Sequence, residues 1–105
     1  MKHYSTSHAI SGGALELSAH ELGYDLAAGY PDHQLAVTGL DGGTWTVQVR
    51  PEGCPAWKSH ATGLAETTVQ TVHGLIIDGL RVTLAGLGGA ADPKLYLTSR
   101  NTLQR

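Results

Sequence analysis

Cys54 and His60 are the first pair to consider for catalysis in this 105-residue sequence, because a thiolate is a strong nucleophile once a base removes its proton. The pair lacks the third group that such a site needs, since no acidic residue flanks His60 to orient its ring. Cys54 also stands between Gly53 and Pro55, in a stretch that we expect to be irregular. We therefore interpret it as a small apolar side chain, as most free cysteines are. A single cysteine also excludes an intramolecular disulfide.

Histidines and aspartates are the other candidates for metal or acid–base chemistry. No two histidines have the i, i+2 or i, i+4 spacing of a local ligand pair; they are His3, His8, His20, His33, His60 and His73. Aspartates in or beside turns can cap their own backbone, and this describes Asp25, Asp32, Asp41 and Asp78. A calcium site or a pair of catalytic carboxylates is the alternative for these aspartates. The sequence predicts no metal, no cofactor and no enzyme activity.

Aromatic side chains could form a platform for sugar stacking or a contact surface, and the ones considered are Trp45, Trp57, Tyr24, Tyr30 and Tyr96. Trp45 falls on the inward register of a predicted strand, so we assign it to the core. Trp57 and Tyr96 remain candidates for a surface that contacts a partner, because large aromatic residues carry much of the binding energy at interfaces.

The charge of the chain is close to neutral and evenly spread. Its net charge is −2, and no two of its seven Lys and Arg residues are adjacent. Proteins that bind nucleic acid concentrate positive charge on one face, so we expect no nucleic-acid partner. The first residues lack the apolar core of a signal peptide, and no apolar run reaches membrane-spanning length. We therefore expect a chain made in the cytoplasm that has no membrane contact.

The segment around which the rest is organised is Thr44–Pro51, in which apolar and polar residues alternate strictly. This alternation predicts a strand with one buried and one exposed face. Residues 34–40 alternate in the same way, and the intervening residues 41–43 form a turn signal, so we expect the two segments to form a hairpin. Fourteen glycines and no phenylalanine argue against long helices, in which each interior glycine costs about 1 kcal/mol.

Other short segments also have the composition of strands: residues 14–17, 24–28, 56–60, 66–72, 80–85 and 94–98. About seven short strands separated by turns predict an all-β fold, an antiparallel β-sandwich of the Ig-like or jelly-roll-like type. The inward positions predict a core formed by Leu35, Val37, Trp45, Val47, Val49, Val82, Leu84, Leu95 and Leu97. Residues 61–64 and the pair Asp78 and Gly79 are expected to be turns, whereas residues 75–77 fit either a buried strand or a loop.

The beginning of the chain is polar, and we interpret residues 1–13 as an extended arm that precedes a single sandwich domain of residues 14–105. Such a segment orders when it docks onto a partner. Tyr4 and Ile10 are its candidate anchors in such an interface. An arm that pairs with a neighbouring subunit would also cover an open strand edge, which predicts a homo-oligomer, most plausibly a trimer or another small ring.

A set of motifs resembles small β-sandwich proteins in the virions of tailed bacteriophages. It comprises residues 39–53 (GLDGGTWTVQVRPEG), Trp57, residues 72–75 (VHGL) and residues 80–86 (LRVTLAG), within the stretch from residue 34 to residue 99. Proteins of this kind are accessory structural subunits that decorate the head or sit at the neck or tail. The resemblance implies a virion location, contacts with capsid, neck or tail proteins, and no catalytic residue. The alternative is a carbohydrate-binding β-sandwich module, in which aromatic side chains face the solvent.

Overall fold

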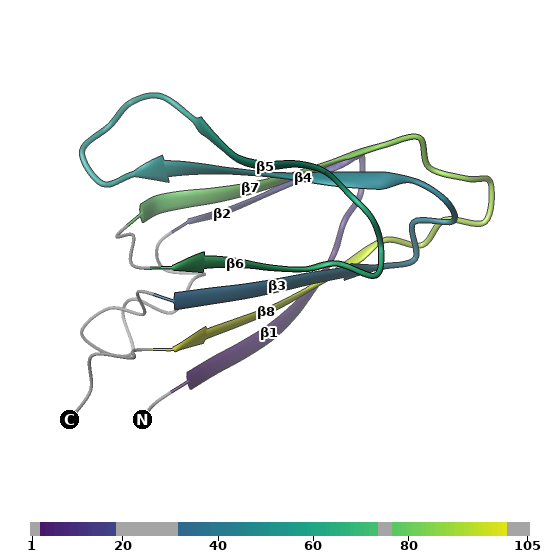
Figure 1. The fold of residues 1–105 in the computed structure, drawn as a ribbon, viewed down its shortest axis with the longest axis horizontal. Coiled ribbons are helices and arrows are strands. Elements are labelled where there is room, and N and C mark those ends of the chain that lie inside the picture. Colours follow the sequence, from purple (N-terminus) through teal and green to yellow (C-terminus); the bar gives the residue numbers. More distant parts are fainter. Residues whose placement is uncertain (1–2, 19–31, 74–76, 101–105) are drawn as a thin grey trace.

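The computed structural model describes residues 3–18, 32–73 and 77–100. All regular elements of these residues are strands: β1 (His3–Ala9), β2 (Ala14–Ser18), β3 (Asp32–Thr38), β4 (Thr44–Pro51), β5 (Lys58–Leu64), β6 (Val69–His73), β7 (Ile77–Ala85) and β8 (Lys94–Arg100). They form two layers that face each other along their length (Figure 1). The antiparallel β-sandwich predicted from the sequence is therefore confirmed.

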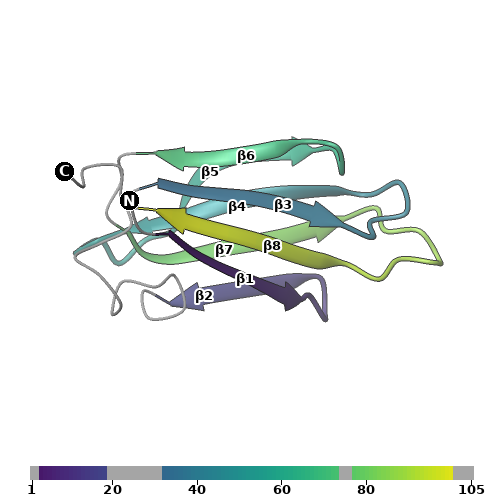
Figure 2. The same cartoon turned by 90° about the horizontal axis from the view of Figure 1, so that it is seen from below.

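The two sheets contain four strands each, and their strand orders show how the chain is wound. One sheet has the order β1-β8-β3-β6, which we call sheet A, and the other has the order β2-β7-β4-β5, which we call sheet B. The antiparallel pairs are nested, since β4 pairs with β5, β3 with β6, β2 with β7 and β1 with β8. A long hairpin wound across two sheets in this way is a jelly roll. Figure 2 shows the strands of sheet A crossing in front of those of sheet B.

The core lies between the sheets, and strict alternation along the strands fills it. In β4, the side chains of Trp45, Val47 and Val49 point inward and are buried. The other predicted core residues are buried as well, except for Leu84, which is partly buried and packs against the core. The indole N–H of Trp45 donates to the backbone oxygen of Ala65 at 2.9 Å, so the largest core side chain leaves no buried donor unpaired.

Residues 34–40 and β4 do not form the expected hairpin. The turn at Asp41 and Gly42 is tight, with positive φ at both residues and a hydrogen bond from Gly43 N to Leu40 O. β3 nevertheless pairs with β6 and β8, whereas β4 pairs with β5 and β7. The turn carries the chain from sheet A to sheet B, and Leu40, just before it, is fully buried in the core.

Two expected turns lie inside strands. Asp78 and Gly79 belong to β7, where Gly79 pairs with residues on both neighbouring strands. Residues 61–64 continue β5, which pairs with β4 through two register shifts. Ile77 starts β7 and is fully buried, which favours the strand alternative for this position. The predicted strand at residues 24–28 lies outside the described residues.

The segment interpreted as an arm is part of the sandwich itself. β1 pairs with β8 along its whole length, from His3 opposite Arg100 to Ala9 opposite Lys94. Ile10 follows as a core residue with 5% exposure, and its backbone N–H donates to Pro93 O at 3.0 Å. Such a strand, composed mostly of Ser, Thr and His, suits the edge of a sheet. Backbone hydrogen bonds to its neighbour can hold it in place although it has few apolar side chains.

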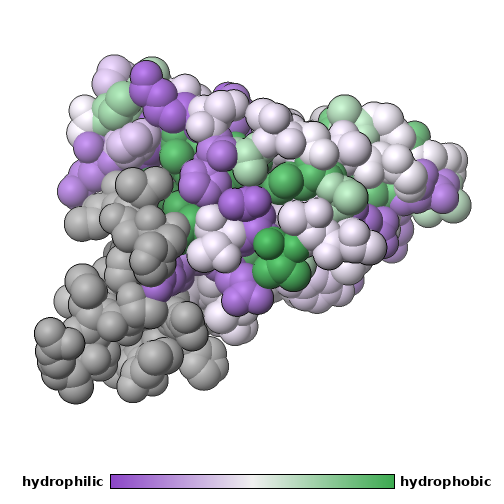
Figure 3. Space-filling view, in the orientation of Figure 1, coloured by the Kyte–Doolittle hydropathy of each residue, from purple (hydrophilic) through white to green (hydrophobic). Residues whose placement is uncertain are grey.

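The edges formed by β5 and β6 face the viewer in the orientation of Figure 1. Figure 3 shows small hydrophobic areas on this side, interspersed with hydrophilic ones. The most exposed large apolar side chain of the described residues is Val69 of β6, at 55%. One link between the sheets on this side is a hydrogen bond between His60 Nε2 and the backbone oxygen of Thr71, at 2.9 Å.

Candidate binding site

The outer face of sheet B carries a row of polar side chains that the strand register places side by side. Arg81 of β7 lies between Glu16 of β2 and Gln48 of β4. Its Nε donates to Gln48 Oε1 at 2.8 Å, and one terminal nitrogen lies 3.7 Å from Glu16 Oε2. The guanidinium is thus fixed from both sides within the sheet.

Trp57 lies over this face, although it comes from the connection between β4 and β5. The guanidinium carbon of Arg81 is 4.6 Å from the centre of its indole ring, and that of Arg50 is 5.3 Å away. The tip of the ring rests on Gly79, where an added Cβ would lie 3.0 Å from an indole carbon. Cation–π contacts and the missing side chain at Gly79 therefore hold the indole against the sheet.

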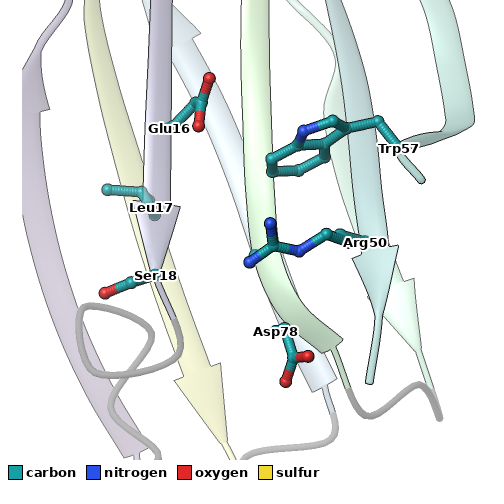
Figure 4. Close-up of a pocket in the computed structure, with 7 residues that line it drawn as sticks. Glu16, Leu17, Ser18, Arg50, Trp57 and Asp78 are labelled. Atoms are coloured by element: carbon teal, nitrogen blue, oxygen red, sulfur yellow. The ribbon is translucent and has the colours of Figure 1, made fainter. Parts of the chain in front are cut away.

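A cleft opens beside Trp57 (Figure 4). It encloses about 250 Å³ and is lined by Glu16, Leu17, Ser18, Arg50, Trp57, Asp78 and Gly79. Figure 4 shows residues 16–18 of β2 on one side, Trp57 and Arg50 on the other, and Asp78 at one end. The cleft combines a cation, two carboxylates and an apolar wall.

The polar groups of the cleft differ in the hydrogen bonds and ion pairs that they already make within the protein. Asp78 Oδ2 accepts a hydrogen bond from Gly53 N at 3.3 Å. Glu16 is paired only loosely with Arg81, and its side chain is 62% exposed. Within the described residues, Arg50 makes no hydrogen bond or ion pair, so its guanidinium donors remain available to a ligand.

The outer face of sheet A has a different character. Strand register aligns Ser7, Tyr96, Ala36 and Val69 in one row across all four strands, and Ser5, Thr98, Gln34 and Thr71 in the next. Neither row contains a charged residue. Tyr96 stands near the middle of this surface and is 45% exposed.

The four interface candidates from the sequence fall in different places. Trp57 lies on the outer face of sheet B and Tyr96 on that of sheet A, so the fold does not bring them together. Ile10 is in the core and is not available to a partner. The backbone of Tyr4 pairs with Ser99 in the β1–β8 ladder, and its side chain lies outside the described part.

A buried polar pair occupies the core of sheet A near one end. His33 and Ser99 are both fully buried, and His33 Nδ1 lies 2.7 Å from Ser99 Oγ. Burial lowers the pKa of His33 from 6.5 to about 4, and the nearby charge of Asp32 offsets part of this effect. The imidazole is therefore neutral at pH 7 and acts as a hydrogen-bonding core residue.

The other candidates for metal binding or catalysis do not form a cluster in the part of the chain that the structure describes. Among the described residues, no three His, Cys, Asp or Glu side chains form a group that could hold a metal ion. The thiol of Cys54 donates a hydrogen bond to the backbone oxygen of Ala56, at 3.6 Å. In the same part of the chain, no helix has the length and apolar character needed to cross a membrane.

Sequence reasoning did not find Arg50, Arg81 and Glu16 as members of one site. Alternation did identify Arg50 as an outward residue of its strand, and the same signal applies to Arg81. Their meeting at Trp57 depends on which strands are neighbours, and this information is absent from local patterns. Comparison with protein-family models, with curated protein sequences and with solved structures finds no match for the chain.

Proposed function

We propose that the protein is an accessory structural subunit of a tailed-bacteriophage virion that acts through protein–protein contacts. Capsid decoration is the favoured role, and a position at the neck or tail is the alternative within the same class. Two supports are independent of each other: the motif resemblance between residues 34 and 99, and a jelly-roll strand order, which occurs in viral capsid domains as well as in lectins.

The observation that carries this proposal is the middle of the outer face of sheet A, where two adjacent rows are uncharged and Lys94 stands in the row next to Tyr96. Interface centres are depleted of charge and enriched in aromatic residues, and this face combines two uncharged rows with the half-exposed Tyr96. β1 supplies Ser5 and Ser7 to the face. The N-terminal segment thus contributes to docking as a strand of the sheet, in place of the arm expected from the sequence.

The proposed subunit is made in the host cytoplasm and becomes part of the particle. It forms a homo-oligomer, with a trimer or another small ring as the expected form. The strands β1 and β6 at the edges of sheet A, and β2 and β5 at those of sheet B, each have one neighbour within the chain. Pairing or covering of such edges by another subunit is a common solution.

The test combines particle analysis with a variant of the docking face. Gradient-purified virions from a lysate that contains the chain should include it at a fixed ratio to the major capsid protein. Ala36→Arg, which places a charge beside Tyr96, should abolish incorporation, whereas Thr83→Arg on the outer face of sheet B should not. Absence of the wild-type chain from virions would refute the proposed function. Equal incorporation of both variants would refute the docking face alone.

A further inference from the structure

We propose that the cleft beside Trp57 is a binding site for one neutral pyranose ring of a saccharide. This function is separate from particle docking, because the cleft lies on sheet B and the docking face lies on sheet A. The carbohydrate-binding alternative considered from the sequence would use this cleft.

The mixture of charges in the cleft argues for a hydroxyl-bearing ligand. Arg50 offers donors that no described residue uses, and Glu16 and Asp78 offer carboxylate acceptors. A sugar hydroxyl can accept from a guanidinium and donate to a carboxylate at the same time. A simple anion would be attracted by Arg50 but repelled by the two carboxylates. A cation would be attracted by the carboxylates but repelled by Arg50.

The apolar part of the cleft fits the carbon-bound hydrogens of a sugar ring. Trp57 forms the apolar wall, and Gly79 lies beneath its ring. Leu17 also lines the cleft, but its side chain belongs to the core and is only 2% exposed. Both guanidinium groups approach the indole, at 4.6 and 5.3 Å, so Trp57 acts as a fixed wall and not as a wide open platform. Fixation of the wall limits the conformational entropy that binding would cost.

The size of the cleft limits the ligand to about one ring. Pockets for drug-sized ligands usually exceed about 300 Å³, whereas this cleft encloses about 250 Å³. A ligand of this size with ordinary efficiency per atom binds with a Kd of about 1–10 mM. Such weak binding becomes useful when many copies on one particle engage a polysaccharide together.

The test is a titration of the ¹⁵N-labelled full chain with the methyl glycosides of glucose, galactose, mannose and N-acetylglucosamine, followed by NMR. At least one glycoside should shift the indole signal of Trp57 and the amide signal of Gly79. The indole of Trp45, which is fully buried, should not respond. Sodium acetate serves as the anion probe and should shift these signals less than the glycoside does.

Two variants show whether the cleft itself binds the sugar. Arg50→Gln should weaken binding about tenfold, because it removes charge-assisted hydrogen bonds. This variant should fold, since Arg50 makes no hydrogen bond or ion pair within the described residues. Tyr96→Ala, which removes an exposed aromatic residue from the other sheet, should bind as the wild type does.

Three results would each overturn the inference: no shift at Trp57 with any of the four glycosides, an Arg50→Gln affinity equal to that of the wild type, or a stronger response to acetate than to every sugar. None of these results bears on incorporation into virions, so a failure here is distinguishable from a failure of the proposed function.

Discussion

Acidification from pH 7 to pH 5 should destabilise the protein through His33, because the folded state holds this imidazole neutral in the core. Its pKa is 6.5 in the unfolded chain and about 4 in the folded protein. Between these values the unfolded state binds the proton more readily, so the free energy of unfolding falls as the pH falls. The contribution is fully present above pH 6.5 and is progressively lost toward pH 4.

The magnitude follows from the two pKa values. The gap corresponds to about 3 kcal/mol once the pH is well below both values. At pH 5 the loss relative to pH 7 is about 2 kcal/mol, because most unfolded chains but few folded ones are protonated there. For a domain of this size, the loss lowers the melting temperature by about 10 °C.

Urea unfolding at pH 7 and pH 5, followed by the fluorescence of Trp45 and Trp57 together, measures this effect. The variant His33→Gln cannot titrate at this position, so its stability should change by about 2 kcal/mol less than that of the wild type between the two pH values. Val49→Ala, a core variant that retains His33, should keep the wild-type pH dependence although it is less stable. If His33→Gln and the wild type lose the same stability, the reasoning about this residue is wrong.

Other perturbations test the fold and the cleft. Val47→Asp should prevent folding, as seen by circular dichroism, because it buries an unpaired carboxylate; wild-type stability would contradict the assigned register. Deletion of residues 1–11 should lower the melting temperature strongly or cause aggregation, since it removes the edge strand β1 and the core residue Ile10; an unchanged melting temperature would contradict this account. Gly79→Ala should displace the ring of Trp57, change its fluorescence and weaken glycoside binding, and an unaltered emission spectrum would speak against the contact. EDTA should leave the melting temperature unchanged, and a drop that zinc or calcium reverses would show an essential metal.

Much of the sandwich was predictable because alternation is a local property of the chain. The strand at Thr44–Pro51 has the predicted bounds, and its inward side chains are buried. The strand β8 and the later part of β7 follow the same rule. One physical cause accounts for these successes, namely that successive side chains of a strand point to opposite faces of the sheet.

The partners of each strand were harder to predict, because pairing depends on residues far apart in the sequence. Asp41 and Gly42 have the turn chemistry of a hairpin and the positive φ that goes with it, yet they join strands of different sheets. β1 was missed for a related reason. Its backbone is paired with β8, whose Lys94 lies more than eighty positions after Ala9. A polar strand held by such a distant partner has no local signature.

The candidate site could be predicted only in part. Trp57 was recognised as a surface aromatic, but the glycine beneath it was interpreted as a turn residue. Gly79 in fact lies near one end of the outer face of sheet B, opposite Ser18 and Arg50, where the absence of a side chain makes room for the indole. A glycine inside a strand often marks the close approach of another group.

The two outer faces of the sandwich are suited to different tasks, and the wound topology keeps them apart. Sheet A presents two uncharged rows, of which one contains Tyr96, and this area can be desolvated against a protein without stripping water from ions; Lys94 stands in the next row. Sheet B presents Arg50, Arg81 and Glu16, whose burial in a flat protein interface would be costly unless every charge were paired. Docking through sheet A therefore leaves the cleft of sheet B exposed on the far side of the molecule. A subunit bound to a particle in this orientation would turn its saccharide site outward, toward whatever surface the particle meets.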